Sequence, residues 1–299
     1  MPSSLLFIIA SLIWGSTFWA ITQQLGEVAP AVSVAYRFGL ASLTLFIWCL
    51  VRKDKLVLPW KLQKWLALQG FFTFSLSYLC TYSSEQYLVS ALVAVLFSLM
   101  VIWSPLTERI FFHKPLTWRI WGAAFISITG VILLFFPALK SNWEETHTGH
   151  DTHFLLGLGL ALTATLASTF GNLVVVKVRQ KNQNVLLTMA WAMAWGTFWV
   201  SLFAIITGQH WSIPTTTNYW LSLIYLSLFG SVIAFACYFT LIHRIGAQKT
   251  VFIGVITPII SVLLSVKLEN YQPGLIEWLG MVFCLGGVVW ALRGDSKAT

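Results

Sequence analysis

Two charged residues lie inside or beside apolar stretches of this sequence, where a charge is costly. Arg37 is seven residues past Pro30, where one apolar stretch begins, and Glu85 lies in a short turn between two others. A charge in such a medium usually has a partner or a function. Two interpretations follow. Either Arg37 is held structurally, by Glu85 as an ion pair or by a backbone carbonyl, or the two charges receive the carboxylate and amine of a zwitterionic solute.

The first apolar stretch carries small and hydroxylated residues near its middle. Gly15 allows a neighbouring helix to approach closely, and Ser16 and Thr17 can hydrogen-bond across such a contact. The ring of Trp14 lies at a depth where it could stack on a solute. We interpret Trp14 as part of a cavity wall, whereas Gly15 and Ser16 are equally compatible with plain helix packing.

Further hydroxyl, phenol and amide side chains lie at comparable depth in later stretches. Ser168 and Asn172 match the depth of the first group, and a buried amide without a partner is costly. Tyr78 and Tyr82 are four residues apart and share one helix face, in a stretch so rich in hydroxyls that it favours a cavity or a helix contact over lipid. Tyr238 adds another aromatic face. We predict that these side chains bind solute.

Two prolines interrupt later apolar stretches. Pro105 and Pro258 each remove a backbone donor and free the carbonyl four residues earlier. Broken helices of this kind often mark a transporter's binding site, and a passive kink is the alternative. The N-terminal ends of the same two stretches, with Ser90 and Gln248, offer N–H groups to anionic ligand atoms.

Several kinds of catalytic and metal site are missing from the sequence. It has no nucleotide-binding loop, nucleophile elbow or paired carboxylates, so we expect neither enzyme activity nor a cofactor. His147, His150, Asp151 and His153 crowd one polar connection but form no closed ligand set, and we expect no metal. The four cysteines lie in apolar stretches and predict buried thiols, not disulfides.

The composition places these residues in a membrane protein. Of the 299 residues 58% are apolar and 9% charged, whereas soluble domains are about half apolar and about a quarter charged. An α-helical span needs about 20 mostly apolar residues, and ten windows qualify. They are residues 4–23, 30–51, 63–82, 87–111, 117–137, 153–176, 185–206, 219–242, 248–267 and 274–293. The first window continues without a basic leader, which predicts a retained span and not a cleaved signal peptide.

The windows divide into two similar halves. Ala167-Ser168-Thr169-Phe170 repeats Gly15-Ser16-Thr17-Phe18 after 152 residues. The polar segment 138–152 separates two sets of five windows, so we predict one repeat over 1–137, an extracytoplasmic linker and a second repeat over 153–299. An odd number of spans gives the second repeat the opposite orientation, the inverted-repeat arrangement of many transporters.

The basic residues predict the orientation of the chain. Fifteen of the 18 Lys and Arg residues fall on the side that holds both termini, two fall on the other side, and Arg37 lies within a span. Since positive loops stay in the cytoplasm, both termini are predicted to be cytoplasmic. The same distribution explains the net charge of +8 by loops at the membrane, so we expect no nucleic-acid partner.

The sequence resembles the EamA-type repeat of the drug/metabolite transporter superfamily over nearly its whole length. The residues that carry the resemblance are Trp14-Gly15-Ser16-Thr17-Phe18, Pro30, Arg37, Gly122 and Gly130-Val131, then Pro258, Glu269, Gly280 and Gly286-Gly287-Val288. The resemblance implies a single-chain carrier of small metabolites, often an exporter, without ATPase modules. One departure is His113-Lys114-Pro115, where the first repeat usually carries a glutamate.

These observations predict a secondary transporter in the bacterial inner membrane. We expect the first, third, fourth, sixth, eighth and ninth spans to enclose a central cavity that opens alternately to each side. The expected solutes are amino acids or related zwitterions, moved outward. Drug or organic-cation efflux and a lipid-handling subunit are the alternatives. Proton coupling stays open, since Glu85, Glu108 and Glu277 all lie near span ends, and the protein is expected as a monomer or homodimer.

Overall fold

The computed structural model describes residues 1–113, 118–145, 153–179, 184–245, 250 and 253–293, and every regular element within them is a helix. The all-α prediction is therefore confirmed for this part of the chain. The first half contains α1 (Ser3–Thr22), α2 (Pro30–Val51), α3 (Trp60–Gln69), the π-helix η1 (Gly70–Leu76), α4 (Ser77–Ser84), α5 (Ser90–Ser98), α6 (Met100–Phe112) and α7 (Trp118–Glu145). The second half contains α8 (His153–Arg179), α9 (Val185–Ile206), α10 (Thr217–Ile224), the π-helix η2 (Tyr225–Ile233), α11 (Ala234–Ile245), α13 (Ile253–Leu268) and α14 (Leu275–Arg293).

Within the described residues, the ten predicted windows fall on helices, but not every helix is a span by its own length and composition. Among the described residues, seven helices are long and apolar enough to cross a membrane, and Ile253–Leu268 and Leu275–Trp290 are shorter apolar helices. The continuous rod from α3 to α4 belongs to neither group, because its polar and hydroxylated residues lower its hydropathy. The count of ten spans stays a prediction.

The predicted linker begins as helix, because α7 continues through Pro137 and ends at Glu145. The division of the chain at this segment stays a prediction. Residues 146–152, which include His147, His150 and Asp151, lie outside the described residues.

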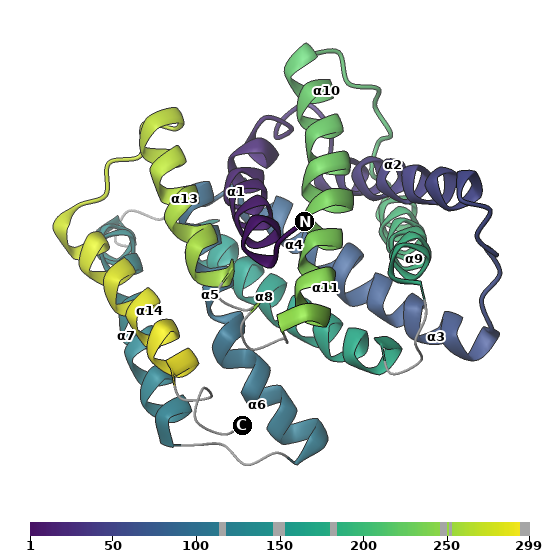
Figure 1. Cartoon of the computed structure of the whole chain (residues 1–299). Coiled ribbons are helices and arrows are strands. Elements are labelled where there is room, and N and C mark those ends of the chain that lie inside the picture. The colour runs from purple at the N-terminus through teal and green to yellow at the C-terminus, as the bar shows by residue number, and fades with distance from the viewer. Residues whose placement is uncertain (114–117, 146–152, 180–183, 246–249, 251–252, 294–299) are drawn as a thin grey trace.

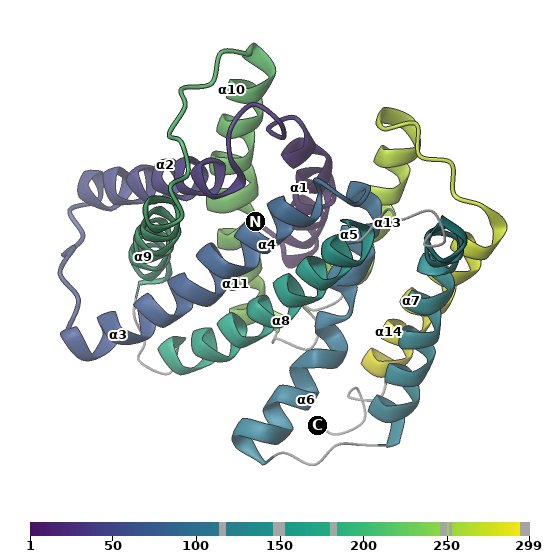
Figure 2. The same cartoon turned by 180° about the vertical axis from the view of Figure 1, so that it is seen from behind.

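Two helix pairs flank a central group of helices. Figures 1 and 2 show α7 beside α14 at one edge of the molecule and α2 beside α9 at the opposite edge. Glycines explain the closeness of the first pair: a Cβ added at Gly130 would lie 2.3 Å from the backbone nitrogen of Cys284, and one at Gly280 would lie 2.4 Å from that of Leu134. Only residues without a side chain allow such contact between helix backbones.

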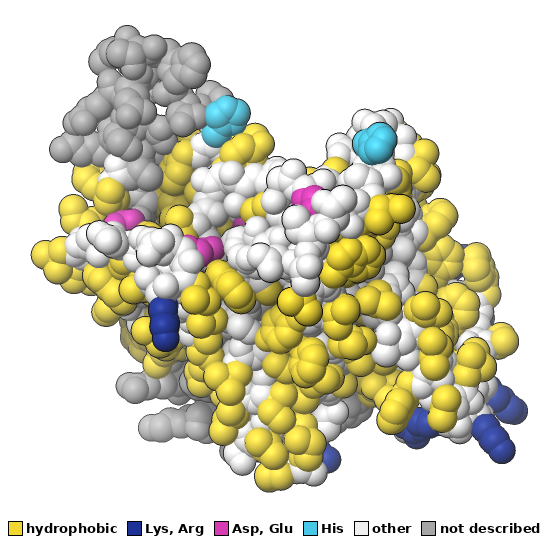
Figure 3. Space-filling model, turned by 90° about the horizontal axis from the view of Figure 1, so that it is seen from above, with side chains coloured by type: hydrophobic (Ala, Val, Ile, Leu, Met, Phe, Trp, Pro, Cys, Tyr) yellow, Lys and Arg dark blue, Asp and Glu magenta, His cyan; other side chains and the backbone are white. Residues whose placement is uncertain are grey.

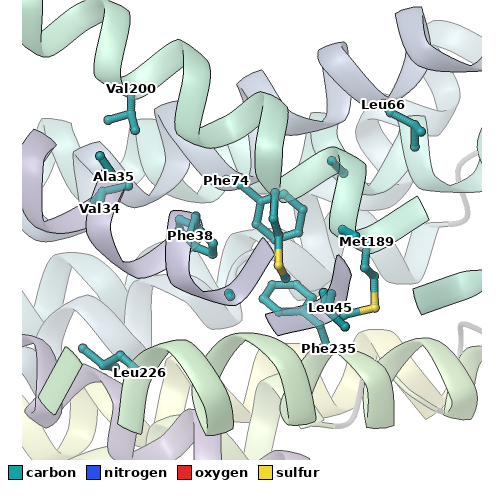
Figure 4. Close-up of a cluster of buried hydrophobic side chains, with 14 of the residues drawn as sticks. Val34, Ala35, Phe38, Leu45, Leu66, Phe74, Met189, Val200, Leu226 and Phe235 are labelled. Atoms are coloured by element: carbon teal, nitrogen blue, oxygen red, sulfur yellow. The ribbon is translucent and has the colours of Figure 1, made fainter. Parts of the chain in front are cut away.

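An aromatic core joins the second pair to the central helices. Phe38 from α2, Phe74 from η1 and Phe235 from α11 point toward one another in Figure 4, with ring centroids 5.1 Å apart for Phe38 and Phe74 and 5.2 Å apart for Phe74 and Phe235. The interior around them is closely packed with aliphatic side chains such as Leu45 and Met189.

Two π-helical segments interrupt otherwise regular rods. Segment η1 separates α3 from α4, and η2 separates α10 from α11. In η2 the Ser231 hydroxyl donates to the carbonyl of Leu226, five residues earlier, at 2.9 Å. That bond matches the wider turn of a π-helix, and such segments are frequent at functional sites. The amphipathic pattern of the sequence does not reveal either segment.

The surface separates apolar from charged side chains. Figure 3 shows hydrophobic side chains over the middle of the molecule, most visible Lys and Arg near one end, and Asp, Glu and His near the other. Large apolar side chains are exposed on many helices, among them Ile132 on α7 and Leu263 on α13. A soluble monomer rarely exposes so much apolar surface, whereas lipid accommodates it.

Candidate functional site

A cavity of about 160 Å³ lies between the central helices. Its walls come from α1, η1 with α4, α5 with α6, α8, α11 and α13, which carry the six windows that were expected to surround it. Aromatic rings form much of the wall, with hydroxyl groups and one amide between them, and no charged side chain lines it among the described residues. The lining residues include Trp14, Phe18, Phe97, Phe235, Tyr78, Tyr238, Thr17, Thr73, Thr81, Ser104, Ser168, Asn172 and Thr257.

Trp14 is the centre of the aromatic wall. Its indole N–H donates to the carbonyl of Gly230 in η2 at 3.2 Å, and its ring centroid lies 5.1 Å from those of both Phe235 and Tyr238. The hydrogen bond fixes the indole, so its face is presented to the cavity in one orientation. Thr17, one helical turn further along α1, packs closely on the same Gly230, where an added Cβ would lie 2.8 Å from the threonine methyl carbon.

The polar part of the wall holds groups that are free to bind a solute. Ser168 is already paired with Ser77, with their hydroxyl oxygens 2.6 Å apart. Within the described residues the Asn172 amide has no protein partner. The buried hydroxyls of Thr73 and Thr257 also lack a partner. A buried polar atom without a bond is costly, so these groups suit a bound solute or water.

The two prolines lie near the cavity, though not as helix breaks. Pro105 lies inside α6 and Pro258 inside α13, and both helices continue past the proline. The helix in the fourth window is instead interrupted at Leu99, between α5 and α6. This corrects the expectation that the prolines interrupt the helices. Val101 and Gly254, whose carbonyls lose their donor to the prolines, both line the cavity.

Of the eleven predicted site residues that the structure describes, six line the cavity and five do not. Those on the wall are Trp14, Thr17, Tyr78, Ser168, Asn172 and Tyr238. Ser16 instead lies 2.6 Å from the Tyr225 hydroxyl, and Ser90 binds Ser265 at 2.9 Å and the Glu269 carboxylate at 2.8 Å. Gln248 lies outside the described residues. The sequence reasoning missed Thr257, Phe97 and Phe235, which only tertiary packing distinguishes from core residues.

Arg37 lies behind the cavity wall. Its side chain is fully buried, its Nε donates to Ser231 at 3.1 Å, and its Nη1 donates to the Tyr82 hydroxyl at 3.5 Å. The guanidinium carbon lies 4.6 Å from the centre of the Tyr78 ring, a cation–π contact. Tyr78 also lines the cavity, whereas Arg37 does not, so Tyr78 contacts both the charge and the cavity.

The expected ion pair between Arg37 and Glu85 is not formed. Among the described residues the ion pair found joins Arg52 to Asp54, while both Glu85 carboxylate oxygens are buried without a hydrogen-bond partner. Tyr82 takes the place of the carboxylate: it accepts from Arg37 and donates to Gln24 at 3.0 Å. Glu85 therefore does not face the cavity and does not neutralise Arg37 in this conformation.

A carboxylate outside the helices links the connection between α1 and α2 to the residues just before α10. Glu27, in the connection between α1 and α2, accepts hydrogen bonds from the backbone N–H of Thr215 and Thr216 and from the hydroxyl of each. Together these bonds lower the pKa of Glu27 from 4.5 to about 2. The side-chain bond from Thr216 contributes most, followed by the backbone bond from Thr215. The carboxylate lies at the start of α10, where a negative charge also stabilises the helix dipole.

Comparison with known proteins identifies a family and several relatives of this chain. A family model described as the EamA-like transporter family matches residues 1–136 and 155–293. The chain is 26% identical to an "Uncharacterized transporter in trpA 3'region" of Buchnera aphidicola, over 95% of this chain and 91% of the relative. It is 24% identical to the "Uncharacterized inner membrane transporter YedA" of Escherichia coli, over 94% and 86%, and to "Protein PagO" of Salmonella typhimurium, over 91% and 85%. A solved crystal structure shares the fold with a TM-score of 0.69 at 17% identity, over 99% of this chain and 98% of the other.

Proposed function

Because this chain belongs to the EamA-like transporter family and is a multi-pass membrane protein, we propose that it is a secondary carrier of small metabolites that works by alternating access. One observation carries the proposal: a cavity that helices of both halves enclose, with an aromatic wall and unpaired polar groups. Solute sites of secondary transporters lie between repeats in this way. The division into repeats at 1–137 and 153–299, the cytoplasmic termini and the bacterial inner membrane belong to the same proposal.

The favoured solutes are amino acids or related zwitterions with an apolar side, and the favoured direction is export. Trp14, Phe235 and Tyr238 offer stacking to a planar or aliphatic side chain. The free carbonyls beside Pro105 and Pro258 accept hydrogen bonds from an ammonium group, as unwound carbonyls do in other carriers. Because no charge lines the described wall, the solute must be neutral overall or compensate its own charges.

An organic cation is the second candidate solute. The face of Trp14 attracts a cation through its π electrons, and the free carbonyls of Val101 and Gly254 add partial negative charge. Against it stands the absence of any carboxylate among the described lining residues, since a buried cation needs compensation. A lipid-handling subunit is the reading that would follow if no solute were transported.

The test is uptake into proteoliposomes that contain the purified full chain. The probes are a panel of labelled amino acids and labelled tetraethylammonium. We expect saturable uptake of at least one amino acid and a loss of about tenfold or more in Trp14→Ala, since stacked aromatic contacts contribute on the order of 1 kcal/mol and more where a solute is desolvated.

The matched control is Trp48→Ala, which removes the same side chain from the lipid-facing surface of α2, where Trp48 is 56% exposed. Its uptake should equal that of the unmodified protein. Equal losses in both variants would argue against the cavity as the site. Saturable uptake of tetraethylammonium alone would replace the amino acid assignment by the cation assignment, and no uptake of any probe by folded protein would contradict the carrier proposal.

A further inference from the structure

Next to the cavity, three buried side chains carry polar atoms without partners. Glu85 is 5% exposed, in the turn after α4, and neither carboxylate oxygen accepts a hydrogen bond. Arg37 and Gln24 are 0% exposed, and the Nη2 of Arg37 and the Nε2 of Gln24 donate to nothing. Unpaired buried groups in a native structure require an explanation. Here two free donors and one free acceptor lie in the same buried region and are chemically complementary.

The surroundings of Glu85 favour its neutral form in this conformation. Burial without a donor disfavours a carboxylate. The nearby Glu269, at the end of α13 and bound to Ser90, disfavours it further by like charge. Arg37 on α2 acts in the opposite direction, but its guanidinium is turned toward Ser231 and Tyr82.

No other charged group engages Glu85 among the described residues. Tyr82, on the helix that ends just before Glu85, interacts electrostatically with Glu85 but donates its hydrogen bond to Gln24. His153, at the start of the neighbouring α8, stacks on Tyr87 with ring centroids 5.5 Å apart. Besides burial, the charged groups that act on Glu85 are therefore Glu269 and Arg37.

Arg37 connects this group to the cavity. Tyr78 contacts the guanidinium with its ring and also lines the cavity. On another side, a Cβ added at Gly230 would lie 3.1 Å from the unpaired Nη2 of Arg37, and the Gly230 carbonyl holds the indole of Trp14. A movement of the guanidinium must therefore displace residues that form the cavity wall.

We propose that Glu85 is the proton-binding group of this carrier and that Arg37 communicates its state to the cavity. In this proposal the carboxyl holds its proton in the conformation described. When the O–H bond breaks, the proton leaves to water and its electron pair stays on the carboxylate, which then takes the free N–H groups of Arg37 and Gln24. The inference rests on the proposed transport function and adds proton coupling to it.

The first experiment separates coupling from transport. Proteoliposomes with the amino acid that gives the strongest saturable uptake are assayed for accumulation driven by a pH gradient and for exchange of labelled against unlabelled solute without one. In Glu85→Gln we expect the gradient-driven accumulation to fall by about tenfold or more, within the range of coupling between two sites, and the exchange to stay within about twofold. Glu277→Gln is the matched control, because Glu277 has its own partners in Tyr271 and Gly274, and both activities should be retained.

Failure of this inference is distinct from failure of the carrier proposal. Saturable exchange with no response to a pH gradient in the unmodified protein, or unchanged gradient-driven accumulation in Glu85→Gln, would overturn the assignment of Glu85 and leave the carrier intact. The control also has a decisive outcome. If Glu277→Gln lost accumulation as strongly as Glu85→Gln did, the effect would not be specific to Glu85 and the assignment would fall.

A second measurement needs no solute. Infrared difference spectra between neutral and alkaline pH, a range in which solvated carboxylates stay ionised, should show the loss of a protonated carboxyl band in the unmodified protein and in Glu277→Gln, and should lack this band in Glu85→Gln. The same band in Glu85→Gln would overturn the proposal. If Glu85→Gln does not fold, Glu85→Asp replaces it: a shifted midpoint of the band supports Glu85 as its source, and an unchanged midpoint contradicts it.

Discussion

At the scale of single residues, side chains that line the cavity differ from those that lie behind its wall. Trp14 and Asn172 line the cavity, whereas Arg37 does not line it and contacts Tyr78, which does. Sequence position identifies a charged residue inside an apolar stretch, but not the direction of its side chain. Whether such a charge binds solute directly or acts through a neighbour depends on a rotation of the helix by a fraction of a turn.

Glu27 supports a prediction about pH. Its pKa is lowered from 4.5 to about 2 by bonds that exist only in the folded chain, so its contribution to stability is fully present above the unfolded pKa and disappears as the pH falls through the folded pKa. We expect Glu27→Gln to melt at a lower temperature than the unmodified protein at neutral pH. The difference should shrink between about pH 4.5 and about pH 2.

Thermal unfolding in detergent at a series of pH values measures this effect. Because unfolding of a membrane protein is often irreversible, both proteins are compared at one heating rate. A difference in melting temperature that stays constant from neutral to acid pH would show that the charge of Glu27 does not stabilise the connection to α10.

At the scale of elements, the sequence predicts the helices better than the π-helical segments and the breaks within them. Window lengths and turn residues place the ends of α2 and α9 correctly, because an apolar stretch of about 20 residues between polar turns has few other solutions in lipid. The π-segments η1 and η2, the break at Leu99 and the extension of α7 to Glu145 were not predicted. Segment η2, for example, makes contacts between helices, such as the bond from Arg37 to Ser231 and the close packing of Thr17 on Gly230, that a single stretch of sequence does not contain.

The glycine contacts between α7 and α14 lead to a prediction about stability. A Cβ at Gly130 would lie 2.3 Å from a backbone nitrogen of α14, and a backbone cannot move aside as a flexible side chain does. Gly130→Ala should therefore destabilise the protein by about 1–3 kcal/mol or more, the usual cost of overpacking. Gly286→Ala is the matched control on the partner helix, since nothing lies within 4 Å of its Cβ position.

Melting curves and size-exclusion profiles of the two variants in detergent provide the comparison. We expect a lower melting temperature for Gly130→Ala alone, while Gly286→Ala should be neutral or slightly more stable, because alanine favours a helix over glycine. Equal behaviour of the two variants would mean that α7 and α14 do not approach as closely as described.

At the scale of the whole molecule, helices distant in the sequence enclose one cavity. Helix α1 packs on α13 and α11, and α8 packs on α4 and η1. Each half alone would leave its part of the cavity wall, with hydroxyl groups such as Thr73 and Thr257, open to lipid. The cavity therefore requires both halves. The composition predicted this membrane environment, and the choice of wall residues required the packing of the complete chain.

The distribution of charge predicts how the molecule lies in the membrane. Lys55, between α2 and α3, and His210, between α9 and α10, are exposed at opposite ends of the α2–α9 pair. Contacts fix both ends: Asp54 accepts from Asn184 at 2.9 Å at one end, and the Tyr36 hydroxyl donates to the Ser212 carbonyl at 3.2 Å at the other. Since the basic end should face the cytoplasm, a membrane-impermeant maleimide added to intact cells should label His210→Cys and not Lys55→Cys. Lys55→Cys should react only after the membrane is permeabilised. The four natural cysteines are buried and contribute little background, so labelling of Lys55→Cys in intact cells would contradict the proposed orientation.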